Sequence, residues 1–342
     1  MLSVLAVAAL ALCCALPVVG FTGYLVARKL SLPAATRTLA PTAAPLTPSA
    51  TATPAPVCGG PPVMFILLIG SDARSSGYTA GLADSIRIAR VDFVNPGIMM
   101  LSFQRDMYVE IPGISSHGGI THGKLNQAYL YGNPAFGYFD GPGQGPGLLA
   151  LTMAQNFGTR VDHYAAVNLS TFVRVVDALG GVDVTLPAVV DGRVPGFTSP
   201  SLYFPAGPQH LDGYRTIILA RLRPEGDFQR STDQDLILRA LTVKALSPSV
   251  FAQVPGLIQA FYGSTQTDLG SAEISQLLCL AAMLDPQKIT FLAFPEYLFK
   301  GVRIDDPVLG RPFVWDVDFN VLRTYVSYFN EGTWPEAVPQ SP

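Results

Sequence analysis

The stretch VMFILLIG, residues 63–70, decides the fold expected for this chain. It is an uninterrupted apolar run of strand length, and such runs suit a central strand that is covered on both faces. The loop that follows, residues 71–84, contains Asp72 and Asp84. The sequence SIRIARVDFV, residues 85–94, then alternates in hydrophobicity and predicts a second strand.

Further strands and helices follow along the chain. PGIMMLSFQRDMYVEIP, residues 96–112, predicts a third strand, in which an apolar run leads into the adjacent Arg105 and Asp106. A helix is predicted over residues 143–157, and another begins near Ser170. Residues 227–246 have a helical pattern, while the pattern of residues 211–223 fits either a helix or a strand. Strands interleaved with helices indicate a layered α/β domain.

The N-terminus predicts a membrane anchor and a spacer. Residues 1–27 contain no charged side chain, and a bilayer core of about 30 Å needs roughly 20 apolar residues in a helix. A cleaved signal peptide is the alternative, although no basic residue precedes the segment. Residues 28–62 are rich in Pro, Ala and Thr, which favours a disordered linker. We therefore expect a single-pass protein of the cell membrane, with its globular domain on the extracytoplasmic side.

Composition limits the classes of partner and site. The chain has 342 residues, of which 49% are hydrophobic and 14% charged, and a net charge of −3, so nucleic acid is not an expected partner. Its four cysteines, two of them in the first apolar segment, lack the spacing of a metal site or redox motif. The other two, Cys58 and Cys279, could pair in an extracellular domain, but the sequence alone does not establish this.

Two aspartates are candidate metal ligands. Asp72 follows the first predicted strand and Asp84 precedes the second, so both are expected at one end of the sheet. Two carboxylates that converge there can hold Mg²⁺, which prefers oxygen ligands and keeps substrate phosphates in its shell. For each aspartate alone, the alternative is a turn or cap residue.

Several cations are candidate phosphate ligands. A guanidinium matches phosphate oxygens bidentately. In the predicted helix 227–246, Arg230 and Gln234 share one face, and Arg221 and Arg223 share one side if their segment is extended. The alternative is a solvated helix face with surface arginines.

From about Phe65 to Leu246 these segments, in this order, resemble the LytR-CpsA-Psr family. The blocks that carry the resemblance are LLIGSDAR, ADSIRIARVD, LSFQRDMYVEIPG, HGKLNQAYLYG, VDHYAAVNLSTFVRVVDALGGVDVTLP and LDGYRTIILARLRPEGDFQRSTDQ. The resemblance implies a layered α-β-α domain with a central mixed sheet over residues 63–248. It also implies a phosphotransferase that moves a glycopolymer from a polyprenyl-pyrophosphate carrier to peptidoglycan, with Mg²⁺ or Mn²⁺ as cofactor.

The same resemblance implies roles for individual residues. Asp72 and Asp84 would lie next to the metal, and the pyrophosphate would be bound by Arg105, Lys124, Arg221, Arg223, Arg230 and Gln234. Arg105, Asp106 and Asp84 would be the catalytic residues. Asp106 would either orient Arg105 or accept the proton of the attacking hydroxyl, and we favour the orienting role.

This chain departs from the family pattern at three positions. Leu82 and Asp233 stand where the family often has arginine, and Gln104 stands where it usually has proline. The lost cations favour one alternative to transfer, a scaffold that binds polyprenyl phosphates without transferring a glycan. The second alternative is a pyrophosphatase that uses the same site with water as acceptor. Arg74 and Arg87 are candidates for compensation, although Arg87 should point away from Asp84 on a flat strand.

Residues 249–342 lie outside the resemblance and are expected to pack on the domain as a C-terminal extension. Residues 288–295 predict one more strand, and residues 322–330 a final helix. This segment would either complete the sheet or form a small cap.

Overall fold

The computed structural model describes residues 54–73, 78, 80–224, 226–245, 250 and 265–335. Its centre is a six-stranded sheet, whose strands in spatial order are β11 (Thr265–Thr267), β6 (His163–Asn168), β1 (Val63–Ser71), β2 (Ala83–Asp92), β3 (Gly97–Phe103) and β12 (Ile289–Ala293). β1 is parallel to β6 and antiparallel to β2, so the sheet is mixed, as predicted.

Strand β1 is the centre of the hydrophobic core. Eight of its nine residues are buried. Ile66 and Leu68 belong to one core cluster, while Leu67 and Ile69 belong to the cluster on the other face of the sheet. Burial on both faces explains why the sequence shows a continuous apolar run here instead of alternation.

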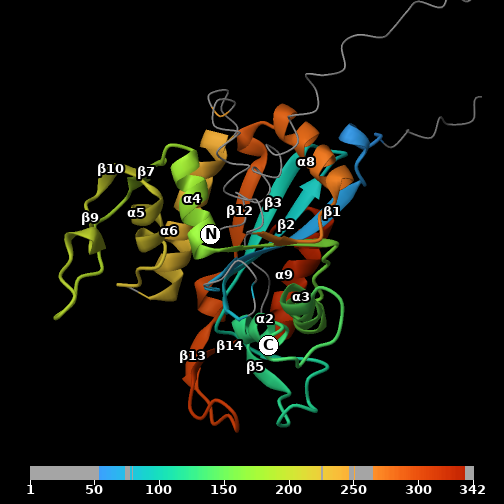
Figure 1. Ribbon diagram of the computed structural model, residues 1–342. Coiled ribbons are helices and arrows are strands. Elements are labelled where there is room, and N and C mark those ends of the chain that lie inside the picture. The colour runs from blue at the N-terminus through green and yellow to red at the C-terminus, as the bar shows by residue number, and fades with distance from the viewer. Residues whose placement is uncertain are drawn as a thin grey trace, which may run out of the picture.

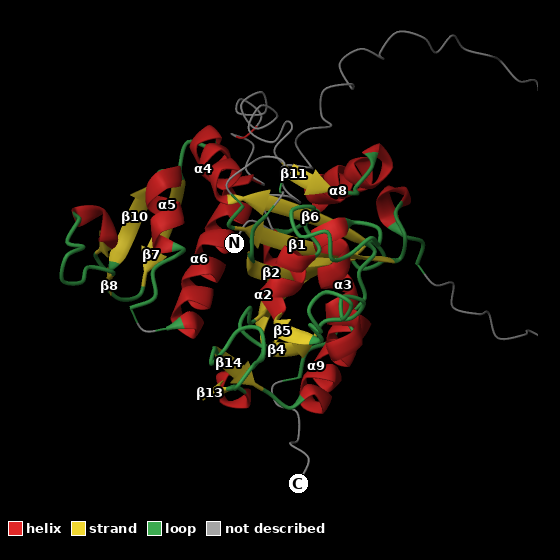
Figure 2. Ribbon diagram, turned by 60° about the horizontal axis from the view of Figure 1, so that its bottom comes forward, coloured by secondary structure: helices red, strands yellow, loops and turns green. Residues whose placement is uncertain are grey.

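Helices cover both faces of this sheet (Figures 1 and 2). One face packs against α2 (Leu125–Tyr131), α3 (Gln144–Phe157) and α9 (Phe319–Glu331). The other packs against α4 (Leu169–Ala178), α5 (Gly213–Leu219), α6 (Asp227–Ala245) and α8 (Ser271–Met283). The α/β fold with a central mixed sheet is therefore confirmed, and its layers run helix, sheet, helix.

Strand directions bring several segments to one edge of the sheet. Because β1 and β3 are both antiparallel to β2, their carboxyl ends lie beside the amino end of β2. The carboxyl end of β6 lies at the same edge, since β6 is parallel to β1. Loops at such an edge are where open α/β sheets place their ligands.

The third predicted strand is divided in two, so its prediction as one strand over residues 96–112 was wrong. β3 ends at Phe103, and a short strand β4 (Tyr108–Glu110) forms a separate sheet with β5 (His122–Lys124). A turn separates β3 from β4, and it contains Arg105 and Asp106.

The C-terminal residues complete the sheet, which decides between the two arrangements considered for them. β11 and β12 are its outermost strands, and β12 pairs in parallel with β3. The region also forms the hairpin of β13 (Lys300–Arg303) and β14 (Phe313–Asp316), together with two short 3-10 helices, η5 (Pro286–Lys288) and η6 (Glu296–Leu298).

A projecting part of the molecule lies at the left of Figure 1. It consists of two small antiparallel sheets and a 3-10 helix: β7 (Val182–Leu186) with β10 (Gly207–Leu211), β8 (Val190–Asp191) with β9 (Tyr203–Phe204), and η3 (Pro200–Leu202). We call it the arm.

The segment before β1 is attached to the domain. The 3-10 helix η2 (Val57–Gly59) lies against the core, and a disulfide joins Cys58 to Cys279 of α8. The predicted linker therefore gives way to ordered structure before Pro62. The predicted anchor 1–27 and the linker up to residue 53 lie outside the described residues, among which no helix is long and apolar enough to cross a membrane.

Candidate functional site

The centre of the candidate site is the turn between β3 and β4. The Met107 amide donates to the Gln104 carbonyl at 3.3 Å, which places Arg105 and Asp106 at the two middle positions of the turn. A buried strand therefore ends in an adjacent cation and anion because the chain reverses there. The turn lies at the sheet edge where β1 ends and β2 begins.

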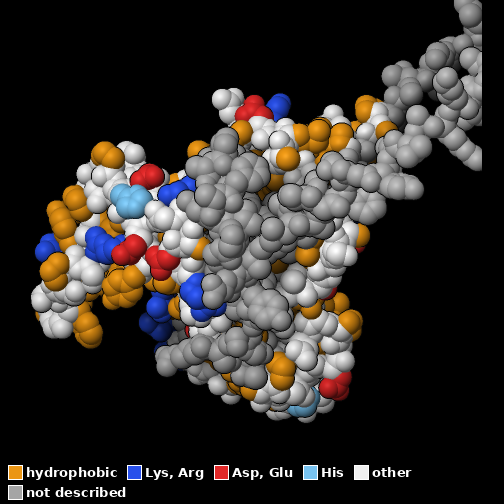
Figure 3. Space-filling view, turned by 45° about the horizontal axis from the view of Figure 1, so that its top comes forward, with side chains coloured by type: hydrophobic (Ala, Val, Ile, Leu, Met, Phe, Trp, Pro, Cys, Tyr) orange, Lys and Arg blue, Asp and Glu red, His pale blue; other side chains and the backbone are white. Residues whose placement is uncertain are grey.

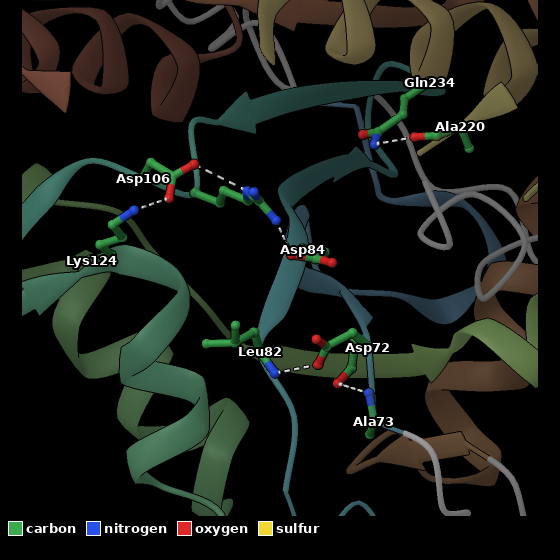
Figure 4. A network of polar contacts seen from close by, with 10 residues as sticks. Asp72, Ala73, Leu82, Asp84, Asp106, Lys124, Ala220 and Gln234 are labelled. Carbon is green, nitrogen blue, oxygen red and sulfur yellow. Dashed lines mark hydrogen bonds and ion pairs between the residues drawn. The ribbon is translucent and has the colours of Figure 1, made fainter. Parts of the chain in front are cut away.

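Arg105 is held between two carboxylates. Its guanidinium pairs with Asp84 at the start of β2, and its Nε donates to Asp106 Oδ2 at 3.2 Å. Lys124 Nζ lies 2.8 Å from the other Asp106 oxygen (Figure 4). Four predicted site residues thus form one connected network.

Asp106 is 6% exposed, yet its carboxyl group is stabilised as an anion. Burial by itself raises the pKa of Asp106, but the hydrogen bond from Lys124 and the positive charge of Arg105 together lower that pKa below its ordinary value. Both carboxylate oxygens accept from cations. A carboxylate of this kind orients its partners better than it accepts a proton.

The start of α2 fixes the backbone of the turn. The Leu125 amide donates to the Met107 carbonyl at 2.9 Å, and the Asn126 amide donates to the Arg105 carbonyl at 3.0 Å. Gln127 accepts from the Lys124 amide at 2.8 Å, which stabilises the first turn of the helix. The block HGKLNQ therefore positions the Arg105–Asp106 turn.

Asp72 and Asp84 lie at the same edge of the sheet, as predicted. The Leu82 amide donates to Asp72 Oδ1 at 2.6 Å, and the Asp72 amide donates to the Leu82 carbonyl at 3.1 Å. These bonds hold the residue after β1 against the residues before β2 (Figure 4).

The donor set in this region fits a hard cation only in part. The described residues contain no group of three or more His, Cys, Asp or Glu that could hold a metal ion. Mg²⁺, however, is commonly bound by one or two carboxylates, with waters and substrate phosphates as its other ligands. Asp72 and Asp84 match that chemistry.

Helix α6 supplies two of the four remaining predicted residues. Arg230 and Gln234 are 5% and 7% exposed, so they lie on its buried face. The Gln234 side chain donates to the Ala220 carbonyl at 3.1 Å, next to Arg221. Arg221 and Arg223 are exposed; Arg221 lies in the turn after α5, and neither residue belongs to a strand. Figure 3 shows Lys and Arg side chains where the arm meets the rest of the molecule.

The sequence profile of the LytR_cpsA_psr family matches residues 62–305. This chain belongs to that family. The match extends past residue 248 and includes β11, β12 and β13, which agrees with their place in the structure.

Curated relatives are 27% to 30% identical to this LytR_cpsA_psr protein over the residues that align. Regulatory protein MsrR of Staphylococcus aureus (strain COL) is 27% identical over 215 residues, which cover 62% of this chain and 58% of MsrR. Polyisoprenyl-teichoic acid–peptidoglycan teichoic acid transferase TagU of Oceanobacillus iheyensis is 30% identical over 216 residues, covering 62% of this chain and 61% of TagU. The chain therefore spans about three fifths of the length of these relatives.

A solved structure of B. subtilis TagV has the same fold. It matches with a TM-score of 0.60 and 23% identity, covering 80% of this chain and 98% of TagV.

The departures from the family pattern have structural consequences. Asp233 is 2% exposed and accepts from Gln229 Nε2 at 3.1 Å. Arg87 is fully buried and lies 2.6 Å from Asp235 of α6, so it points away from Asp84, as predicted. It therefore supplies no cation at Asp84. Arg74 lies outside the described residues.

Other residues next to this network were not predicted from the sequence. Tyr108 donates to Asp306 at 2.8 Å, and burial together with this hydrogen bond raises the pKa of Tyr108 to about 12. The Trp315 amide donates to the Asp106 carbonyl at 3.0 Å. Both partners come from the C-terminal region, where no local motif marks them.

Proposed function

We propose that this protein transfers a glycopolymer from a polyprenyl-pyrophosphate carrier to peptidoglycan. The observation that carries the proposal is that Asp84 and Asp106 hold Arg105 at the edge of the sheet where β1 and β3 end, which is also the edge that carries Asp72. The relative TagU is a polyisoprenyl-teichoic acid–peptidoglycan teichoic acid transferase, which supports the same reaction class.

The residues present indicate where a divalent cation would bind. Asp72 and Asp84 would hold Mg²⁺ or Mn²⁺, which when bound neutralises charge on the phosphate oxygens. Arg105, Lys124, Arg221, Arg223, Arg230 and Gln234 would bind the pyrophosphate around it. An anion with this much charge requires several donors, and arginine remains charged at every relevant pH.

The transfer requires little covalent chemistry from the protein. The oxygen of an acceptor hydroxyl forms a bond to the phosphorus that bears the glycan, and its proton passes to water. The bridging P–O bond breaks, and polyprenyl phosphate leaves with the electron pair. Arg105 and the arginines near α6 align the phosphates and neutralise the charge that builds on oxygen. Asp106 orients Arg105, because its lowered pKa and its two cationic partners disfavour proton uptake.

We propose that the protein is located in the cell membrane, on the basis of its disulfide and its apolar N-terminal segment. A disulfide between Cys58 and Cys279 favours an oxidising compartment. Residues 1–27 would anchor the chain as a single span in the cell membrane, with the domain on the extracytoplasmic side. The lipid-linked donor would then be presented by the same membrane.

The experiment uses the full chain, a polyprenyl-pyrophosphate oligosaccharide and peptidoglycan oligomers, with and without Mg²⁺. We expect a metal-dependent product whose mass corresponds to phosphoglycan on the acceptor, and a loss of roughly 10²- to 10³-fold in Arg105→Ala. Arg193→Ala is the matched control, because Arg193 forms an exposed ion pair with Asp191 on the arm.

The same assay separates the alternatives. Free phosphorylated glycan as the sole product would indicate a pyrophosphatase. Binding of the donor without turnover would indicate a scaffold, a reading favoured by Leu82 and by the buried carboxylate of Asp233.

A further inference from the structure

Trp315 of β14 contacts the Arg105–Asp106 turn through its backbone. Its amide donates to the Asp106 carbonyl at 3.0 Å, and it forms a parallel β-bridge with Met107. The hairpin that carries Trp315 thus lies next to the start of β4, although β13 and β14 form a sheet of their own. Figures 1 and 2 both show β14 beside these strands.

The indole ring of Trp315 contacts the other half of the candidate site. It packs edge-on against Phe228, with ring centroids 5.3 Å apart. Phe228 lies in the first turn of α6, two residues before Arg230. Phe299 contacts both rings, at 5.4 Å from Phe228 and 6.3 Å from Trp315. The rings make a small aromatic cluster between the hairpin and α6.

One residue therefore joins two groups of phosphate ligands that come from distant parts of the chain. Its backbone holds the turn with Arg105, and its side chain holds the start of the helix with Arg230 and Gln234. Edge-to-face aromatic pairs stabilise more than their buried area alone accounts for, and they favour one relative orientation of the two rings.

We propose that Trp315 is a positioning residue that fixes the separation between Arg105 and the buried face of α6. The role rests on the proposed function, since a pyrophosphate needs ligands on both of its phosphorus centres at once. A displacement of about 1 Å between such ligands can lower the rate about 10²-fold. Trp315 would itself touch no reacting atom, because its contacts are to the backbone of the turn and to aromatic rings.

The variants are chosen to loosen the contact without removing a phosphate ligand. Phe228→Leu removes the aromatic partner on α6, and Trp315→Phe shortens the ring on the hairpin. Trp334→Phe is the matched control, because Trp334, the other tryptophan of the chain, packs on Phe294 and Tyr325 instead.

The first measurement is amide hydrogen exchange on the full chain, which requires no substrate. We expect Phe228→Leu to raise exchange at least tenfold at the Trp315 amide and over residues 105–108, although the substitution is on α6. Trp334→Phe should leave those amides unchanged. Unchanged exchange at Trp315 in Phe228→Leu would overturn the proposal.

The second measurement is steady-state transfer. We expect kcat to fall about 10- to 100-fold in Phe228→Leu and Trp315→Phe, with KM for the donor changed less than kcat, and the double variant to be little worse than either single one. A merely structural role would lower the unfolding temperature and leave kcat unchanged below it, which would overturn the positioning role. If Phe228→Leu raises exchange at the Trp315 amide but the wild type transfers no glycan, the contact between the hairpin and α6 is supported. The proposed function is then wrong.

Discussion

Lys124 Nζ lies 2.8 Å from Asp106 Oδ1, and this ion pair links the residue before α2 to the turn after β3. Asp106 is buried, while the Lys124 side chain is 23% exposed. The pair therefore affects both stability and the charge state of Asp106.

Replacing Lys124 by Met should make the protein more sensitive to acid. In the wild type the folded-state pKa of Asp106 lies below its ordinary value of 3.8, so the ionised carboxylate stabilises the fold above that pH. This stability is lost as the pH falls through the folded-state pKa. Without Lys124 the pKa rises, so the loss begins at a higher pH, and stability at neutral pH falls by about 1–3 kcal/mol. Urea unfolding from pH 3 to 7 measures both effects.

The control for Lys124→Met is Lys288→Met, because Lys288 is exposed in the 3-10 helix η5. A wild-type pH profile in Lys124→Met would show that the ion pair does not set the pKa of Asp106.

Substitutions of Arg87 and Asp235 should have non-additive effects on the free energy of unfolding. Arg87→Met leaves the Asp235 carboxylate without this partner, and we expect a loss of about 2–4 kcal/mol in the free energy of unfolding, because Asp235 is largely buried. Adding Asp235→Leu should recover much of this loss, since no unpaired charge then remains. Chemical denaturation of the two single variants and the double variant gives the coupling. A double variant as unstable as Arg87→Met would contradict the prediction.

Leu82→Arg should strengthen binding of the donor. The backbone amide and carbonyl of Leu82 hold Asp72, and a change of side chain leaves both bonds in place. A guanidinium at this position would restore a cation that the family often has, and we expect affinity for a short-chain prenyl pyrophosphate to rise about 3- to 10-fold. Titration calorimetry with Mg²⁺ present measures it, with Leu82→Met as the control for side-chain volume. Equal affinity in both variants would mean that residue 82 lies too far from the phosphates.

The disulfide should contribute strongly to stability. Cys58 and Cys279 are 221 positions apart, and a cross-link over so long a loop restricts the unfolded chain, which typically stabilises by about 2–5 kcal/mol. Reductant should therefore lower the urea midpoint of the wild type. The double variant Cys58→Ser/Cys279→Ser should unfold at the same midpoint with and without reductant. If reductant leaves the wild-type midpoint unchanged, the disulfide makes no such contribution.

Local pattern was sufficient for the central strands and for most helices. The run at residues 63–70 is buried on both faces, and the helix predicted over residues 143–157 is α3. The expected convergence of Asp72 and Asp84 followed from strand direction alone. In each of these cases the feature depends on residues close together in the sequence.

Features that depend on distant contacts were not predictable in this way. The strand predicted through residue 112 breaks at Gln104 because the turn is held by α2 and by Trp315. Nothing near Trp315 in the sequence indicates its bond to Asp106. Likewise, the pattern over residues 211–223 was ambiguous and gave no sign that the Ala220 carbonyl, next to Arg221, accepts a hydrogen bond from Gln234 of α6.

The order of the central strands has a consequence for synthesis of the chain. Its outermost members, β11 and β12, are made last, so β6 and β3 have unpaired edges until residues 265–293 have emerged. Open edges of buried, apolar strands are templates for pairing with other chains. A product truncated before residue 265 would therefore keep both edges open and tend to aggregate. The last quarter of the chain thus protects the sheet from aggregation by covering these two edges.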